Sequence, residues 1–261
     1  MFRIRLFCTI SIFLCALYSS RAQDWESAAV AYERIIYDGA GLEETNEALL
    51  GKAGCYKQLG RYSDAVATLS RVRMFALTDE ERAGVLYEQE LCHYLGGEFE
   101  EAAALVGEIE PVNRDILLLH ALVLAYAGRY DESEIMAARY ISWNGPSDQL
   151  DALLKLYKEH PRTRNTSAAL VLGFLPPLGH IYNEAYGEGA LSLGLNAAAV
   201  AFTAASLLGG YWITGIAGGA IALDYAWLGS QERSMQLTQI YNDNAPLLFG
   251  DKLREFLSKV Q

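Results

Sequence analysis

The sequence predicts an all-α protein in which an array of helical repeats is followed by a transmembrane helical hairpin. A short pattern of a glycine, an aromatic residue and a small residue recurs along residues 24–133 at the spacing of helix pairs. Two long apolar runs come after it: residues 189–208 carry no charged side chain, and residues 209–229 carry Asp224 alone. Each run is about as long as the ~20 apolar residues with which a helix crosses a bilayer.

The N-terminus has the features of a secretory signal peptide. Arg3 and Arg5 precede an apolar run over residues 6–17, and Ser20-Arg21-Ala22 offers the small residues that a signal peptidase reads. We therefore expect residues 1–22 to be a signal peptide that is cleaved after Ala22. An uncleaved membrane anchor is the alternative, and the shortness of the run argues against it.

Composition limits the classes of partner. The 261 residues are 52% apolar, which is high for a wholly soluble protein. The net charge is -11, and loss of Arg3, Arg5 and Arg21 with the leader would bring it to -14. A chain this acidic lacks the Lys and Arg excess that neutralises phosphates, so we expect no binding to nucleic acid.

Four copies of the repeated pattern occur, at residues 24–28, 60–65, 97–102 and 128–133. The small residue falls at positions 28, 65, 102 and 133, so the steps are 37, 37 and 31 residues. This pattern resembles the tetratricopeptide repeat, whose period is ~34 residues. The positions that carry the resemblance are Gly60, Tyr62, Ala65, Gly97, Phe99, Ala102, Gly128, Tyr130 and Ser133.

The resemblance implies three full helix pairs and an initial half pair over residues 23–160. The glycine closes the turn between the helices, the aromatic fills the wedge between them, and the small residue permits close approach. Apolar periodicity predicts first helices over residues 47–59, 80–95 and 114–127, the second of them opened by a capping box of Thr78 and Glu81. Second helices are expected over residues 25–37, 62–73, 99–109 and 130–142, and a terminal helix over 147–160.

Arrays of this kind bind peptide segments of other proteins in a concave groove, which is what the resemblance implies here. A purely rigid spacer is the alternative. Cys55 and Cys92 occupy equivalent places in successive first helices. Because neighbouring helix axes lie ~8–10 Å apart, we expect two buried thiols, with a disulfide as the alternative.

The membrane region, residues 161–230, opens with a segment broken by prolines. About ten apolar residues precede Pro176 and Pro177, too few to span, so this piece is expected to be interfacial or re-entrant. The residues from this proline pair onward resemble the Pro-Gly-x-Gly-x-x-Tyr-x-Gly signature of small bacterial membrane domains without an assigned biochemical role. Pro177 and Glu184 replace two of its glycines. The positions that carry this resemblance are Pro176, Pro177, Gly179, His180, Tyr182, Gly187 and Gly189.

The two apolar runs are rich in small residues, and Gly215 and Gly219 have the spacing that brings helix backbones together in lipid. We expect a tight hairpin that turns at residues 209–212. Three spans are the alternative, and the basic residues on the two sides do not separate the cases. Contact between copies through the spans, giving a homo-oligomer, is left open. Residues 231–261 are expected to form a polar tail with a short amphipathic helix over 246–260.

The search for chemistry finds no catalytic, cofactor or metal motif. The four histidines show no metal-ligand spacing, and His120 lies in the most apolar helix, where a core role is expected. His180 and Tyr182, in the loop after the proline pair, are the polar pair selected as functional candidates, with a structural role in the turn as the favoured alternative. Asn196 and Asp224 are the polar exceptions in the spans, and Asp224 is expected near the interface because its run ends a few residues later.

The sequence therefore favours a non-enzymatic, membrane-anchored adaptor or scaffold of the bacterial cell envelope, in the inner membrane with its repeats on the periplasmic side. Its expected partners are another protein and the lipid bilayer, and no cofactor is implied. The alternative is a function of the membrane domain itself, in membrane protein insertion, assembly or transport, which the repeats would regulate.

Overall fold

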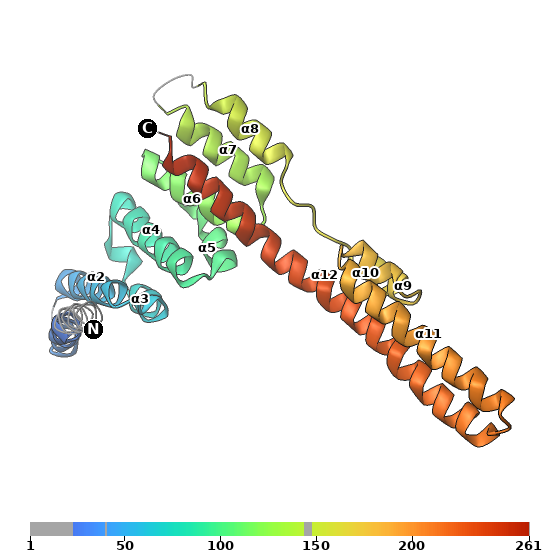
Figure 1. Ribbon diagram of the computed structural model, residues 1–261. Coiled ribbons are helices and arrows are strands. Elements are labelled where there is room, and N and C mark those ends of the chain that lie inside the picture. The colour runs from blue at the N-terminus through green and yellow to red at the C-terminus, as the bar shows by residue number, and fades with distance from the viewer. Residues whose placement is uncertain (1–22, 40, 144–147, 261) are drawn as a thin grey trace, which may run out of the picture. The chain divides into compact units, whose positions relative to one another are not determined.

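The protein is described by a computed structural model that covers residues 23–39, 41–143 and 148–260. Every regular element within these ranges is a helix, so the all-α class is confirmed. The chain divides into two compact units, and each is described by itself (Figure 1). The first unit runs to Lys158 and includes the C-terminal segment from Leu253, while the second is Glu159–Lys252. The expected signal peptide, residues 1–22, lies outside the described residues.

The first unit is a series of helix pairs joined by short turns, which is a helical repeat architecture. The pairs are α2 (Leu42–Gln58) with α3 (Tyr62–Leu69), α4 (Asp79–Gly96) with α5 (Phe99–Leu105), and α6 (Arg114–Tyr126) with α7 (Tyr130–Ile141). A helix over residues 23–37 precedes them, and α8 (Leu150–Lys158) follows. Successive pairs are held together because α3 contacts α4, α5 contacts α6, and α7 contacts α8.

Several helix boundaries differ from the expected ones. The second helices α3 and α5 are shorter, and each is followed by a 3-10 turn: η1 (Met74–Ala76) and η2 (Val106–Glu108). α2 begins five residues earlier than the expected start at residue 47, because the Glu44 carboxylate accepts a hydrogen bond from the Gly41 N–H and caps the first turn. The capping box at the start of α4 is confirmed, since Thr78 and Glu81 exchange hydrogen bonds of 2.8 and 3.3 Å.

The turn within each pair depends on a glycine. Gly60, Gly97 and Gly128 have φ angles of +70°, +78° and +74°, in the left-handed region that a side chain disfavours. After Gly97, the N–H of Glu98 donates to the carbonyl of His93, which satisfies an orphan acceptor at the end of α4. The repeated glycine is therefore required by the backbone conformation of the turn.

The aromatic and small positions of the repeat lie inside the packed pairs. The Phe99 ring stacks on Tyr126 with centroids 4.6 Å apart and meets Tyr94 edge-on at 5.9 Å. Ala65, Ala102 and Ser133 are fully buried. The Ser133 hydroxyl donates to the Ala121 carbonyl at 2.6 Å, and its oxygen lies 2.7 Å from the Tyr157 hydroxyl. The serine of the last repeat thus joins the final pair to the terminal helix α8.

Cys55 and Cys92 are buried free thiols, as expected from their helix positions. Cys55 lies on α2, and Cys92 lies at the equivalent place on α4. Burial disfavours the thiolate and raises the pKa of Cys92 to about 11. Both cysteines therefore act as core side chains, and neither is a reactive nucleophile.

The second unit contains the apolar region. Its elements are α9 (Thr166–Gly173), α10 (Leu178–Tyr182), α11 (Tyr186–Leu208), the π-helical segment η3 (Thr214–Gly218) and α12 (Gly219–Ser258), the last crossing into the first unit at Leu253. The Asn165 side chain accepts from the Ala168 N–H at 3.1 Å and caps α9. The chain reverses at residues 209–211, where Gly210 has a φ of +79°. α11 then lies against η3, and Thr203 and Ser192 of α11 meet Gly219 and Ser230 of α12.

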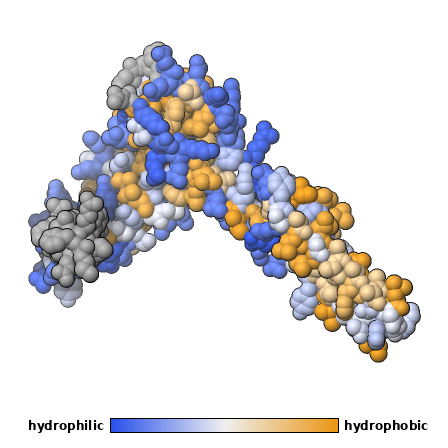
Figure 2. Space-filling view, in the orientation of Figure 1, coloured by the Kyte–Doolittle hydropathy of each residue, from blue (hydrophilic) through white to orange (hydrophobic). Residues whose placement is uncertain are grey.

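One helix among the described residues, α11, is long and apolar enough to cross a membrane. The second span expected over residues 209–229 does not form a separate apolar helix. Its run is divided between η3 and the first quarter of α12, whose remaining residues are mixed in polarity. Apolar residues predominate on the visible surface of α9, α11 and the start of α12 (Figure 2).

The C-terminal segment also differs from the expected short helix over residues 246–260. α12 passes through Pro246 without ending. Its last two turns belong to the first unit, where Leu253 and Leu257 are buried. The apolar side chains of the tail are therefore used in a protein core.

The turn geometry of Gly97 gives a first prediction. Gly97→Ala places a Cβ at a φ of +78°, so we expect it to lower the free energy of unfolding by about 1 kcal/mol. Gly84→Ala is the matched control, because Gly84 lies inside α4 with no heavy atom within 4 Å of an added Cβ. It should be neutral or stabilising by up to ~1 kcal/mol. Thermal unfolding in detergent, followed by circular dichroism, measures both changes, and equal destabilisation would contradict the turn assignment.

Candidate functional sites

The first candidate site is an open groove between α2 and α4 in the repeat unit. Its volume is about 850 Å³. Leu50 and Ala53 of α2 and Val85 of α4 supply its apolar wall, and Leu77 closes it from the connecting segment. Leu50 remains 36% exposed, so its side chain is accessible to a ligand in the groove. A groove of this size and apolarity is suited to the side chains of a peptide segment.

The edges of this groove carry mostly negative charge. Four carboxylates line it: Glu43, Glu47, Glu81 and Glu88. Lys57 is the one basic residue among the described lining residues, and it is engaged by Glu88 in an ion pair. Carboxylates around an apolar floor favour a ligand with basic residues beside an apolar anchor.

Sequence reasoning did not select any groove residue. Leu42, Asn46 and Leu50 recur every four residues along α2 and face the groove, while Leu49 of the same helix is buried in the core. Leu42 and Leu50 are two exposed leucines on a helix that already has a core-facing side, and this is the signal that could have identified the site. The repeat-signature residues lie elsewhere, in the turns and between paired helices.

A buried carboxyl–imidazole pair lies behind this groove, between α4 and α6. Glu90 Oε2 is 3.1 Å from His120 Nε2, and both side chains are fully buried. The atoms are not aligned for a hydrogen bond. Burial raises the pKa of Glu90 because it disfavours the charged form, and the neighbouring His120 opposes that shift. His120 is thus a core residue, as expected, but one that faces a buried acid.

The second candidate site is the proline-broken segment of the second unit. α9 and α10 contact each other on either side of Pro176 and Pro177. Ala169 of α9 contacts Ser234 of α12, and Phe174, just after α9, contacts Trp227 further along α12 toward the turn. Gly179 of α10 lies against Ser234 again. The segment therefore runs out beside the hairpin and comes back. The interfacial or re-entrant location expected for this α9–α10 pair stays a prediction.

Hydrogen bonds satisfy the backbone at this reversal. The Trp227 indole N–H donates to the Phe174 carbonyl at 2.7 Å, at the end of α9. Asn183 Nδ2 donates to the carbonyls of Gly179 and Ser234, and its oxygen accepts from the Thr238 hydroxyl at 2.9 Å. The Trp227 hydrogen bond thus gives the Phe174 carbonyl, at the broken end of α9, a partner from α12.

The motif residues are structural elements of this pair. A Cβ on Gly179 would come within 2.8 Å of Ser234 Cβ and 2.9 Å of Gly173 Cα. A Cβ on Gly189 would lie 3.1 Å from His180 Cβ. The Tyr182 hydroxyl accepts from the Asn165 N–H at 2.9 Å. Gly187, in contrast, faces open space.

His180 and Tyr182, the polar pair selected from the sequence, make separate contacts. His180 is 2% exposed, and its Nδ1 has no hydrogen-bond partner among the described residues. Burial lowers the pKa of His180, with Glu188 opposing the shift and Arg233 adding to it. Tyr182 bonds the backbone before α9. The arrangement is that of two packing residues, without a shared reactive centre.

Ion pairs mark one end of the hairpin. Arg233 donates two hydrogen bonds to the Glu188 carboxylate, at 2.7 and 2.9 Å. Arg164 donates to Glu184 at 2.6 Å, and its guanidinium lies 3.7 Å from the centre of the Tyr241 ring. At the opposite end, Tyr211 and Trp212 are exposed beside the turn. Charges at one end and aromatic residues at the other frame the apolar stretch.

The register of the hairpin is fixed by four contacts. Ser192 hydrogen-bonds Ser230, and Asn196 Nδ2 lies 3.5 Å from the Ala226 carbonyl. Nearer the turn, added Cβ atoms on Gly219 and Gly215 would meet Thr203 and Leu207, each within 2.9 Å. A step of four residues toward the turn along α11 thus corresponds to a step of four residues toward the turn along α12 and η3. The two glycines chosen for span packing face α11 of the same chain.

This register gives the position of Asp224 along the hairpin. Asp224 lies level with Ala198 of α11. Ala198 is ten residues from Glu188 at the charged end and twelve residues from Gly210 at the turn. At 1.5 Å per residue these separations are about 15 and 18 Å. Asp224 therefore lies between the charged end and the turn of the hairpin, and its side chain is exposed. Its expected position near a membrane interface stays a prediction.

No group of three or more potential metal ligands occurs within the described residues. Comparisons of the chain with known protein families, with curated proteins and with solved structures find no match. The groove, the α9–α10 pair and the hairpin are therefore the features of the chain that bear on its function.

The buried acid of the repeat unit leads to a pH prediction. Because the pKa of Glu90 is raised on folding, its contribution to stability is fully present below about pH 4.5 and is lost as pH rises through the folded-state value. We expect Glu90→Gln to reduce the loss of stability between pH 5 and 8. Glu80→Gln, at an exposed position of the same helix, is the control. Urea unfolding across this pH range measures the slopes, and parallel slopes for wild type and Glu90→Gln would contradict the assignment.

The close packing of α10 on α12 gives a prediction for the motif. Gly179→Ala should destabilise the second unit by about 1–3 kcal/mol, because its methyl group overlaps Ser234 and Gly173. Gly187→Ala adds the same methyl group in open space and should change stability by less than ~0.5 kcal/mol. Trp227 fluorescence during unfolding in detergent reports on this region. Similar midpoints for the two variants would show that the α10–α12 contact is absent.

Proposed function

We propose that the protein is a non-enzymatic adaptor, anchored in a membrane by its second unit and binding another protein through the groove between α2 and α4. The open apolar groove with its carboxylate edges is the observation that carries the proposal. Some lining residues are more than core side chains of the repeat unit, since Leu42 and Leu50 are exposed. An adaptor needs a surface of this kind on one unit and an anchor on another.

The anchor in this proposal is the α11 hairpin with its re-entrant pair. α11 exposes most of its apolar surface, unlike the core helix of a soluble protein. The proposal takes both apolar runs as crossing the bilayer together, with Tyr211 and Trp212 at the far interface. It further places the repeats, as tetratricopeptide repeats, on the periplasmic side of a bacterial inner membrane after removal of residues 1–22.

A function of the membrane unit itself is the second candidate. The re-entrant pair of α9 and α10 favours it, because broken helices supported by side-chain hydrogen bonds often line sites in membrane proteins that insert or transport substrates. In that case the repeats would regulate the membrane unit. Loss of residues 161–252 would then abolish the function even when the groove still binds its partner.

Substitution in the groove tests the adaptor. Leu50→Glu introduces a further carboxylate at the apolar wall and should weaken partner binding at least about tenfold, or 1.4 kcal/mol. Ile135→Glu is the matched control, since Ile135 is an exposed apolar residue of α7 outside the groove. Crosslinking in intact envelopes identifies the partner, and titration of that partner against the three purified proteins gives the affinities. Equal affinity for wild type and Leu50→Glu would overturn the adaptor proposal.

A further inference from the structure

Asp224 is an ionisable group in the apolar hairpin, and the neighbouring parts of the chain provide no cation for it. Between residues 189 and 229 the sequence contains no Lys, Arg or His. The nearest cation on α12 is Arg233, nine residues away, and it is bonded to Glu188. Nine residues of helix correspond to about 13 Å, so this guanidinium cannot reach Asp224.

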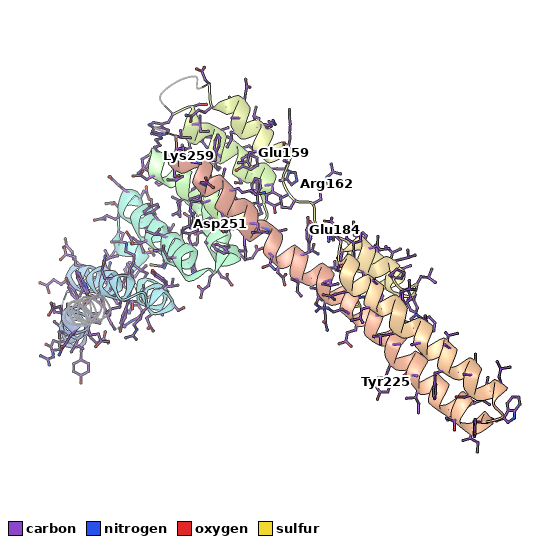
Figure 3. The ribbon with its side chains drawn as sticks, viewed as in Figure 1. Glu159, Arg162, Glu184, Tyr225, Asp251 and Lys259 are labelled. Carbon is purple, nitrogen blue, oxygen red and sulfur yellow. The ribbon has the colours of Figure 1, made fainter. Side chains whose placement is uncertain are left out.

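Helical geometry also directs Asp224 away from α11. The residues of α12 that meet α11 are Gly219, Ala226 and Ser230. At 3.6 residues per turn, Asp224 lies nearly opposite to this face. Tyr225, its exposed neighbour, points away from the hairpin (Figure 3). Asp224 therefore lies on an outer face with Ile221 and Leu228, both of which are exposed apolar residues.

The other polar side chains of the hairpin satisfy themselves within the chain. The Thr203 hydroxyl donates to the Ala199 carbonyl at 2.8 Å, and Asn196 Nδ2 donates to the Ser192 carbonyl at 2.9 Å. Each of these groups has a hydrogen to give to the carbonyl one turn earlier. An ionised carboxyl group has none, and every backbone N–H in the middle of a helix is already bonded. In its ionised form, Asp224 cannot use this internal solution.

We propose that the face formed by Ile221, Asp224 and Leu228 binds a transmembrane helix of another protein that carries a lysine or arginine at the middle of the bilayer. Charge complementarity selects this partner, since a cation is what an isolated carboxylate in hydrocarbon requires. A second copy of the chain is a poorer fit, because two-fold symmetry about the bilayer normal would place two Asp224 carboxylates at the same depth. The inference rests on the proposed spanning of the hairpin.

Designed helices provide the probe. The full-length protein, labelled with a donor fluorophore, is reconstituted in phosphatidylcholine vesicles with acceptor-labelled peptides of ~23 leucine and alanine residues. The central residue of the peptide is Lys, Leu or Glu. We expect energy transfer to give at least about tenfold tighter association with the Lys peptide than with the Leu peptide. Equal association of the Lys and Leu peptides would overturn the proposal.

Charge variants of the protein sharpen the test. Asp224→Asn should reduce association with the Lys peptide to the level of the Leu peptide, and Asp224→Lys should transfer the preference to the Glu peptide. Asp243→Asn removes an exposed carboxylate from the polar part of α12 and should change nothing. If Asp243→Asn weakens association as much as Asp224→Asn does, the attraction is a general effect of net charge and the proposal fails. Energy transfer between protein copies that is lost in Asp224→Asn would also overturn it, in favour of self-association.

A depth measurement separates this inference from the function on which it rests. A fluorophore is attached at Ala198→Cys, level with Asp224, in a protein whose native cysteines are replaced by alanine. Quenching by lipids brominated at different depths should place the label near the bilayer centre. A label at the surface would overturn the spanning hairpin. A central label without a preference for the Lys peptide would leave the anchor intact and overturn only the partner helix.

Discussion

The close contact of α11 with η3 and the start of α12 is the constraint on which the second unit depends. Gly215 and Gly219 lie so near to Leu207 and Thr203 that a Cβ at either position would overlap. The serine pair and Asn196 continue the same register toward the charged end. Because that register is fixed, the position of each group along the hairpin is fixed with it. The ion pair of Arg233 with Glu188 marks one end of the apolar stretch, and the α9–α10 pair contacts α12 beside it.

Local signals in the sequence were sufficient for the repeat unit. A glycine at a positive φ, an aromatic in the wedge and a small residue in the contact each impose a requirement within a few residues, so the pattern can be recognised without coordinates. The groove could not be selected in the same way. Its lining combines α2, α4 and the segment around Leu77, and only folding shows which of several apolar residues are left exposed.

The membrane region shows a different limit of sequence reasoning. Gly179 of the motif was identified, but its partner Ser234 lies more than fifty residues away, in a stretch expected to be a polar tail. The position of Asp224 along the hairpin could not be predicted for the same reason. Its depth was judged from the end of its own apolar run, whereas the helix continues past that end to Arg233 and the opposing Glu188. Depth in a hairpin depends on the partner helix and not on distance along one run.

Two carboxyl groups in apolar surroundings show how the chain treats such groups. Glu90 is fully buried, and the fold supplies His120 against it from the neighbouring helix. Asp224 lies at the middle of the apolar hairpin, and the fold supplies it with no cation from residues 189–229. Its helix instead turns the carboxyl group outward beside exposed Ile221 and Leu228. An internal partner could have been provided by one basic residue on α11, so the outward position argues that the partner is another molecule.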